Sequence, residues 1–345
     1  MKNSCLIFLV CLGCLFNACK PDFSLNAPHK DVPIVYGILN YQDSIHYVKI
    51  YRGFQPSQGT AFIDAQNPDS IYYYNDIKVV LQEYKGEART SRPDIPLEIT
   101  HDFPRDAGIF YYDKERILYT AKALLNKDMI YNINISNKLT GNEINGKTLL
   151  VGDFKIQSTT VNMLAPNPAI SFSEATNAMD YEIHVNFMYF EVDIKTNTVV
   201  KMDTIVKNIC PQIGGSFNRS VSGDLYKNYT PTFYDDIVAH VKPNSNVVRY
   251  IGSPRSPGAC IEVEAWAAGE SLKQFLLANK PTSSFVQVNN IYTNLTASTD
   301  CVFGFLSSRT KCGSEFSVTD TSADSLYFGR KTRHLGFRPW TEYKP

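Results

Sequence analysis

The chain has 345 residues, a length that predicts two domains at the usual size of roughly 100–200 residues each. Hydrophobic residues make up 43% of it and charged residues 20%, which excludes a fully disordered chain. The 34 basic and 34 acidic residues balance, which argues against a nucleic-acid-binding protein, because such proteins normally carry a basic excess.

The first 19 residues predict an export signal. Lys2 precedes an apolar run of 12 residues, Cys5–Phe16, whereas a membrane-spanning helix needs about 20. The run ends in Asn17-Ala18-Cys19, which resembles a bacterial lipoprotein box, where the Cys becomes the lipidated first residue of the mature chain. We therefore expect residues 1–19 to be a lipoprotein signal peptide and Cys19 to carry a lipid anchor to the membrane. A plain secretory signal with an incidental Cys is the alternative.

The cysteines fit an exported protein. Four of the eight lie in the signal segment or at its edge, and the others are Cys210, Cys260, Cys301 and Cys312. An even number in an exported chain predicts disulfides, here Cys301–Cys312 as a local loop and Cys210–Cys260 across the second half. Four buried thiols are the alternative. No CxxC pair with a neighbouring His is present, so neither a metal nor another cofactor is expected.

The first half of the mature chain reads as short strands. After a polar tether at residues 20–31, strands are expected at 32–39, 45–51, 77–84, 97–101, 108–112, 129–136 and 149–156. The clearest is 129–136, where Tyr131, Ile133 and Ile135 alternate with other residues and give one apolar face. Short strands separated by turn residues predict an N-terminal β-sandwich domain over residues 32–160.

The second half is predicted to be a C-terminal β-rich domain over residues 166–329. Strands are expected at 170–172, 182–192, 199–206, 260–266, 286–292 and 314–318. Apolar residues at helical spacing predict short helices at 232–241 and 271–278. Residues 330–345 read as an irregular basic tail. The expected fold class is therefore mainly β: two β-sandwich-like domains, the second with two short helices inserted.

Several short motifs carry a resemblance to a family. The lipobox-like start, Val35–Leu39, Tyr292–Leu295 and Gly304-Phe305 resemble surface lipoproteins of Bacteroidota of the domain-of-unknown-function type, which often accompany TonB-dependent nutrient transporters. The stretch Ala178–Val192 is similar to a fibronectin-III sandwich core. The resemblance implies an outer-membrane lipoprotein of the cell envelope, facing the periplasm or the surface. It also implies a TonB-dependent transporter or a glycan as partner, and no catalytic residues.

Catalytic motifs are missing from the sequence. The six His are scattered without ligand spacing, and there is no GxSxG, P-loop or GxGxxG. His184, two positions after Glu182, is expected to be a structural residue on a strand face. We therefore expect a protein that is not an enzyme, namely a binding or accessory module for nutrient uptake or surface glycan. The alternative is an envelope hydrolase of glycan or peptide, because two catalytic carboxylates leave no short signature.

One repeated triplet, Asp-(Ser/Thr)-aliphatic, resembles the O-glycosylation acceptor pattern of exported Bacteroidota proteins. It occurs four times, with acceptor residues Ser44, Ser70, Thr204 and Ser325. The alternative is local, because Asp-Ser can close a turn after which the aliphatic residue begins a strand.

Overall fold

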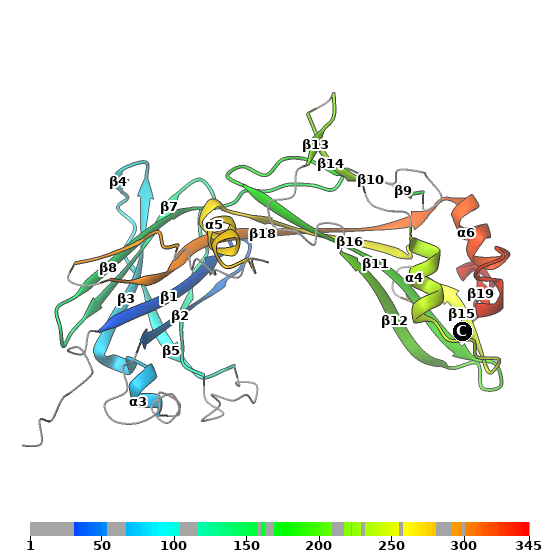
Figure 1. Ribbon diagram of the computed structural model, residues 1–345, viewed down its shortest axis with the longest axis horizontal. Coiled ribbons are helices and arrows are strands. Elements are labelled where there is room, and N and C mark those ends of the chain that lie inside the picture. The colour runs from blue at the N-terminus through cyan, green and yellow to red at the C-terminus, as the bar shows by residue number, and fades with distance from the viewer. Residues whose placement is uncertain are drawn as a thin grey trace, which may run out of the picture.

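The computed structural model describes residues 31–53, 67–103, 116–157, 160–162, 169–208, 217–221, 223–228, 232–254, 258–280, 292–298 and 301–344. Strands predominate in this part of the chain (Figure 1). They are β1 (Val32–Leu39), β2 (Ile45–Gly53), β3 (Ile77–Lys85), β4 (Ala88–Arg89), β5 (Ile95–Thr100), β6 (Leu118–Lys122), β7 (Ile130–Asn137), β8 (Glu143–Leu149), β9 (Thr160–Val161), β10 (Ala169–Phe172), β11 (Asp180–Asp193), β12 (Val199–Asn208), β13 (Asn218–Arg219), β14 (Leu225–Asn228), β15 (Val247–Ile251), β16 (Ile261–Ala268), β17 (Leu295–Ala297), β18 (Phe303–Val318) and β19 (Phe337–Arg338). The helices are α3 (Pro68–Ile71), α4 (Phe233–His240), α5 (Glu270–Ala278) and α6 (Asp320–Tyr327), with 3-10 turns η1 (Tyr74–Asp76), η2 (Arg333–Leu335) and η3 (Trp340–Glu342).

The mainly β class is confirmed, and so are the strands with the strongest alternation. In β7, Tyr131, Ile133 and Ile135 are buried, as their period of two predicts. The two predicted helices are α4 and α5. The strand predicted at 149–156 is wrong, because β8 ends at Leu149 and an irregular segment follows. That segment reads as apolar because it passes between two cores and gives buried residues to both. The strands predicted at 108–112 and 286–292 lie outside the described residues, except for Tyr292.

The first region wraps its strands around one hydrophobic core. The pairing order is β17-β8-β7-β3-β5-β6-β2-β1-β18, and a bridge between Thr293 and Gly304 joins the two ends of this order. Inward side chains such as Leu81, Ile133 and Leu306 are fully buried in the core. Because the strands close on themselves, the sheet has an inner face packed with apolar residues and an outer face.

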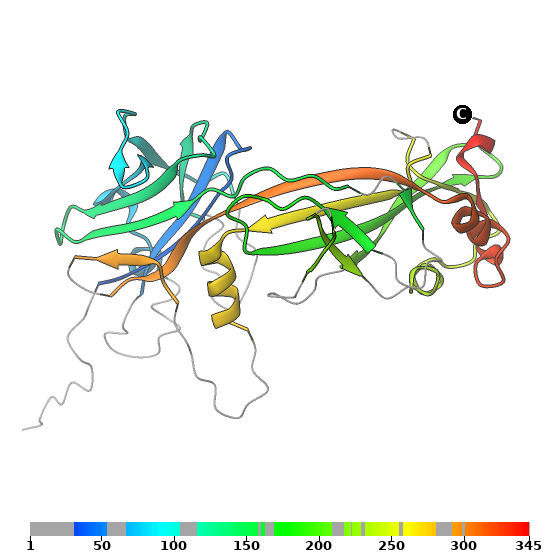
Figure 2. The same cartoon turned by 90° about the horizontal axis from the view of Figure 1, so that it is seen from above.

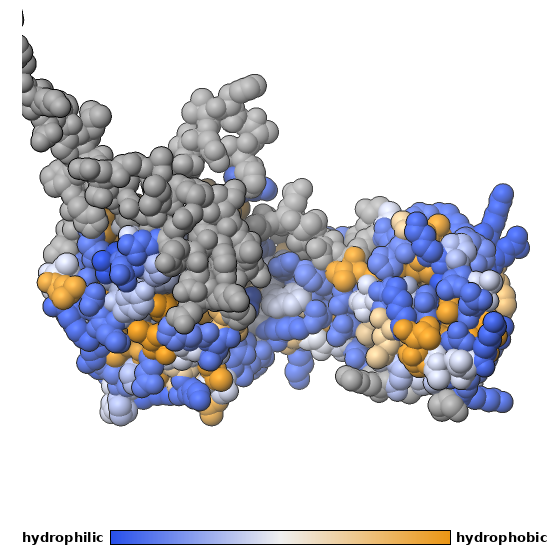
Figure 3. Space-filling model, turned by 90° about the horizontal axis from the view of Figure 1, so that it is seen from below, coloured by the Kyte–Doolittle hydropathy of each residue, from blue (hydrophilic) through white to orange (hydrophobic). Residues whose placement is uncertain are grey.

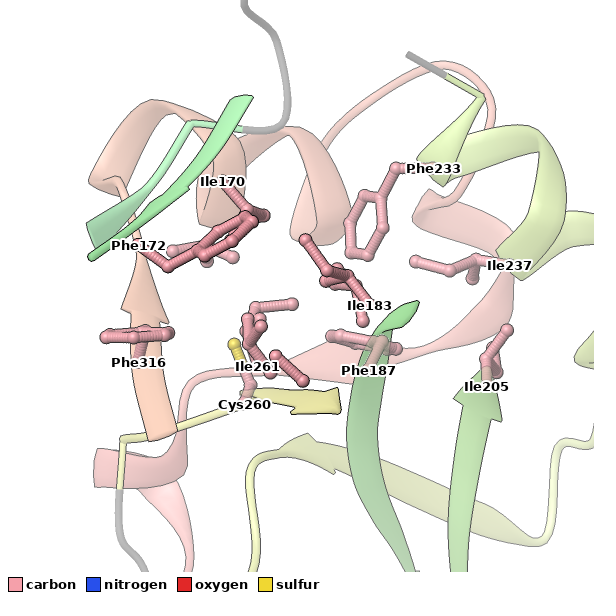
Figure 4. Packing of buried hydrophobic residues seen from close by; sticks show 14 of the residues in the cluster. Ile170, Phe172, Ile183, Phe187, Ile205, Phe233, Ile237, Cys260, Ile261 and Phe316 are labelled. Atoms are coloured by element: carbon pink, nitrogen blue, oxygen red, sulfur yellow. The ribbon is translucent and has the colours of Figure 1, made fainter. Parts of the chain in front are cut away.

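The second region is a sheet covered on one face. Strands β12, β11, β16 and β18 lie side by side. Strand β15 pairs with the last residues of β11, past the end of β16. The second core lies between this sheet and a layer that includes β10, β14, α4 and α6. Figure 2 shows the long strands of the sheet side by side. Phe187 and Ile183 of β11 meet Phe233 and Ile237 of α4 there, and Phe172 of β10 packs beside them (Figure 4).

A single long strand, β18, belongs to both regions (Figure 1). Residues 303–308 pair with β1 in parallel, and residues 309–316 pair with β16 in antiparallel order. Buried hydroxyls lie where the two regions meet: Ser308 Oγ accepts from the Val151 N–H at 2.9 Å, and Thr310 Oγ1 donates to the Val151 carbonyl at 2.6 Å. These bonds satisfy backbone groups that would otherwise be buried without partners.

The end of the chain, which reads as an irregular tail, folds back onto the second region. Strand β19 pairs with β15, and Trp340 and Tyr343 pack on the buried ring of Phe190. Arg249 of β15 ties the segment down, because its Nη1 donates to the Leu335 carbonyl at 2.5 Å. The apolar residues of this segment are spaced without a helical or strand period, so the sequence pattern does not reveal the packing.

The predicted Cys301–Cys312 disulfide is wrong, because both residues are free thiols. Cys312 lies within the extended strand that begins two residues after Cys301. Eleven positions at about 3.3 Å each hold the two Cα atoms far beyond the reach of a disulfide. Cys260 is also a free thiol, and burial raises its pKa to about 11. Cys210 and the lipidation candidate Cys19 lie outside the described residues.

None of the helices in the described part of the chain has the length and apolar character needed to cross a membrane.

Candidate functional site: the open face of the second sheet

The sheet of the second region has one face turned away from its core. Odd-numbered residues of β11 and β16 point into the core, so the even-numbered ones point to the opposite side. We call this surface the open face, and its central part consists of Glu182, His184 and Asn186 on β11, Glu262, Glu264 and Trp266 on β16, and Lys311, Gly313 and Glu315 on β18. Strands β10 and β14 lie above the sheet in Figure 1, and the view from below shows a mainly hydrophilic waist between the two broad ends (Figure 3).

Strand register arranges these nine residues in three rows across the sheet. One row is Glu182, Trp266 and Lys311, the next is His184, Glu264 and Gly313, and the third is Asn186, Glu262 and Glu315. Directly opposed residues on paired strands have Cβ atoms about 4.5–5.5 Å apart. Side chains from three segments far apart in the sequence therefore form one continuous surface.

Trp266 is the aromatic residue at the centre of this surface. Its half-buried ring lies 4.7 Å from the His184 ring, and Lys311 Nζ lies 5.1 Å from its centroid. Both neighbours are held in turn: His184 Nε2 is 2.7 Å from Glu182 Oε1, and Lys311 forms an ion pair with Glu264. The indole is thus fixed in place between charged side chains.

A hollow lies beside this aromatic residue. Gly313 has no side chain, and a Cβ placed there would meet nothing closer than the Val263 carbonyl oxygen at 3.6 Å. Its neighbours along β18, Lys311 and Glu315, are exposed and stand on either side of the gap. A group of a bound molecule can therefore approach the backbone between them.

An unsatisfied acceptor lies in the third row. Asn186 is only 6% exposed, and its Nδ2 donates to Glu262 Oε2 at 3.0 Å. Its Oδ1 has no hydrogen-bond partner. A buried polar atom without a partner costs about 1–3 kcal/mol, so a donor from a bound molecule or a water is favoured at this position.

Apolar side chains flank the polar rows on the side of β12. Met202 and Val206 are each more than half exposed, and they point to the same side of the sheet as Met188 of β11. The open face is therefore polar and acidic over β16 and β18 and apolar along β12.

A second cluster, around Asp203 of β12, tests the hydrolase alternative. Partial burial by itself raises the pKa of Asp203, but hydrogen bonds from Lys201, Tyr189, the Thr204 N–H and His240 lower it to about 2. Through these hydrogen bonds the carboxylate ties β12 to α4. The cluster contains no second carboxylate, which a glycosidase requires.

A third polar network lies in the first region. Burial raises the pKa of Glu83, but hydrogen bonds from Tyr131, Arg92 and Thr90 outweigh it and lower the pKa below its usual value. Tyr131 Oη donates to Glu83 Oε2 at 2.7 Å, and Arg92 Nη1 donates to the same oxygen at 2.9 Å. Every member has a partner, which indicates a structural role. No group of three or more metal-binding side chains occurs among the residues that the structure describes.

The predicted O-glycosylation residues fall in four different settings. Ser44 is exposed in the turn before β2, and Thr204 is exposed within β12. Ser70 lies in α3, and Ser325 lies in α6, where its Oγ donates to the Thr321 carbonyl at 2.9 Å. The turn-before-strand explanation therefore accounts for Ser44 alone, and glycosylation of all four residues stays a prediction.

The sequence alone did not identify the open face. The alternation in residues 260–266 does place Glu262, Glu264 and Trp266 on one side of a strand. His184 was assigned to a strand face with a structural role, and its contact with Trp266 depends on the β11–β16 register. No local signal predicts which strands become neighbours.

Comparisons with known proteins add little. No protein-family model matches this chain, and no curated protein matches it. A solved structure described as "Biofilm associated protein - BSP domain" is similar at 10% sequence identity, covering 82% of this chain and 58% of that chain, with a TM-score of 0.14. The chain thus spans less than two thirds of that chain's length, and a TM-score of this size does not establish a shared fold.

Proposed function

We propose that this protein is a lipid-anchored lipoprotein of the bacterial outer membrane, and that it works as a non-catalytic binding module with the open face as its ligand surface. The lipobox-like Asn17-Ala18-Cys19 and the resemblance to Bacteroidota surface lipoproteins support the location. Its ligand is a saccharide, either a surface glycan or a nutrient glycan passed to a TonB-dependent transporter.

The observation that carries the proposal is Trp266 held by its contacts with His184 and Lys311 among hydrogen-bonding side chains. A sugar ring has an apolar face of C–H groups and a rim of hydroxyls. An indole fixed by His184 and Lys311 supplies a surface for the apolar face, and the carboxylates beside it accept from the hydroxyls. A few polar groups placed around an aromatic residue are typical of small-molecule sites.

The division of the chain into two domains is part of the same proposal. The two hydrophobic cores support two domains, each related to a β-sandwich: an N-terminal one over residues 32–160, to which β17 and the first half of β18 add strands, and a fibronectin-III-like one formed by the rest of residues 166–329. The tether at residues 20–31 then keeps the first domain nearest the membrane. The second domain carries the open face at a distance from it.

The test is saccharide binding by a Trp266→Ala variant, measured by affinity electrophoresis in gels containing soluble polysaccharides. We expect at least a tenfold loss of affinity, because one aromatic anchor commonly contributes more than 1 kcal/mol. Tyr84→Ala is the matched control, since Tyr84 in the first region also has a lysine over its ring, with Lys147 Nζ at 4.6 Å. Equal loss in both variants, or none in either, contradicts the proposal.

The location is tested separately by a Cys19→Ala variant. Labelled palmitate should incorporate into the native protein and not into the variant, and the variant should leave the membrane fraction. A variant that stays membrane-bound contradicts the lipid anchor.

The hydrolase alternative rests on Glu262 and Glu264, which lie two positions apart on the same face of β16. Two carboxylates are the minimum that a glycosidase needs. Glu264 is paired with Lys311 and Glu262 accepts from Asn186, so neither is arranged to deliver a proton. If the protein released reducing ends from a bound polysaccharide, and the Glu264→Gln variant did not, the protein would be a hydrolase and not a binding module.

A further inference from the structure

We propose that the open face selects saccharides that carry free amino groups, and that it discriminates against neutral and anionic glycans. This inference rests on the proposed function and adds the chemical class of its ligand. It follows from the charge of the face, from the way in which the ammonium group of Lys311 binds to it, and from the unsatisfied acceptor of Asn186.

The central rows of the open face are acidic although the whole chain is neutral. They carry four carboxylates, Glu182, Glu262, Glu264 and Glu315, against the single ammonium group of Lys311. A flat surface with this excess of negative charge repels uronic or sulfated polymers and attracts cations. Charge complementarity therefore favours a cationic sugar.

Lys311 shows how an ammonium group binds to this surface. Its Nζ lies over the Trp266 ring while it pairs with Glu264, which combines a cation–π contact with an ion pair. An amino sugar presents the same group next to an apolar ring face. In an oligosaccharide, one sugar ring can lie against the indole while the ammonium group of another unit binds to a carboxylate farther along the face.

The third row offers that carboxylate. Glu262 and Glu315 are cross-strand neighbours, and neither forms an ion pair within the described residues. Asn186 Oδ1, which lacks a donor, sits beside Glu262. An ammonium group has three N–H donors and can satisfy both oxygens, whereas an acetylated amine has one donor and no charge. The missing side chain at Gly313 leaves space beside Glu315, its neighbour on the same face of β18.

The experiment compares four soluble oligosaccharides of equal length by calorimetry on the full chain: a β-1,4-glucosamine oligomer, its N-acetylated form, a neutral β-1,4-glucan and an oligogalacturonate. We expect the free-amine oligomer to bind about tenfold or more tightly than the acetylated and neutral ones, and the acidic one to bind least. Preference for the neutral or the acidic oligomer overturns the inference.

Two variants separate specific recognition from general charge attraction. Glu262→Gln with Glu315→Gln should bring the four affinities to within about threefold of each other, because the ion pairs are lost. The matched control is Glu98→Gln with Glu143→Gln, which removes two exposed carboxylates from the first region. If the control pair lowers amine binding equally, the attraction is non-specific and the inference fails.

Lys311→Ala gives a further measure, in which a cation of the open face itself is removed. It releases Trp266 and Glu264 for a ligand ammonium, so amine binding should become tighter. Weaker binding would show that Lys311 itself contacts the ligand and overturns the cation-selective arrangement. If no oligomer binds and Trp266→Ala changes nothing, the proposed function fails as a whole. If all four oligomers bind equally and Trp266→Ala abolishes this binding, only the selectivity is overturned.

Discussion

The two regions of this protein solve the burial of a β-sheet in different ways. In the first, the strands surround a core, and the β-bridge between Thr293 and Gly304 joins the two ends of the strand order, so the sheet closes on itself. In the second, the core covers one face of the sheet, and the C-terminal segment covers the other face only around Phe190, so the central rows keep polar and aromatic residues in contact with solvent. In a closed arrangement the strands mainly stabilise the fold, whereas a sheet with one uncovered face leaves that face available for binding.

Strand β18 shows the difference within one segment. Residues 304–308, in the first region, are buried without interruption, because the strand is covered on both faces there. From Arg309 onward exposed and more buried residues alternate, as expected for a strand covered on one face. The surroundings of each region, and not the strand itself, set the pattern.

The strongest test of this contrast is Gly304→Ala in the first region. Gly304 has φ +93°, and an added Cβ would lie 1.8 Å from the Val35 carbonyl oxygen of the paired strand. We expect a loss of about 5 kcal/mol in the free energy of unfolding, or failure to fold. The matched control is Gly313→Ala on the same strand, which has open space and should lose less than about 1 kcal/mol. Urea unfolding of both variants checks this, and equal stability would contradict the tight closure.

The second test breaks the covered side of the second region. The side chain of Arg249 is 3% exposed, and its Nε donates to Glu191 Oε1 at 2.9 Å. Arg249→Ala leaves Glu191 buried without its partner, so thermal and urea unfolding should show a loss of about 3 kcal/mol. Arg338→Ala removes an exposed ion pair with Glu342 and should cost less than about 0.5 kcal/mol. Similar losses for the two would argue against a buried charge pair.

The third test concerns the edge strand β12 and its pH dependence. The pKa of Asp203 is about 2 in the folded protein, below its ordinary 3.8. Its stabilising effect is therefore fully present above pH 4 and is lost as the pH falls through 2. Asp203→Asn should lower stability by roughly 1–2 kcal/mol at pH 6, and the difference from the native protein should vanish near pH 2. Asp153→Asn, at an exposed pair with Lys127, is the control, and a pH-independent difference would contradict the assignment.

The smallest effect is expected from thiol labelling, which leaves the fold unchanged. Burial raises the pKa of both Cys260 and Cys312 to about 11, and both pack at the second core. Cys301 is exposed just before β18. Peptide mapping after iodoacetamide treatment should find Cys301 modified in the native protein and the other two only after unfolding. Rapid native labelling of Cys312 would mean that the second core opens easily.

Much of the local structure followed from the sequence. The alternation in 129–136, the β-branched and aromatic run at 45–51 and the helical spacing at 232–241 each correspond to β7, β2 and α4. These elements were predictable because period and turn chemistry act over a few neighbouring residues. The expected disulfide failed for the opposite reason, since cysteine spacing does not show whether the chain between two residues is looped or extended.

The tertiary structure alone decided which strands meet. Strand β18 was expected only at 314–318, because Ser307, Ser308 and Thr310 interrupt its apolar pattern, yet these hydroxyls are buried where the two regions join. The open face likewise exists only through the register that brings β11, β16 and β18 together. By itself the sequence determined the β class and the local strands, because these depend on composition and short periods, and it predicts the export signal. Long-range pairing, and with it the contacts of Trp266 with His184 and Lys311, joins segments that are far apart in the sequence, for which no local pattern carries a signal.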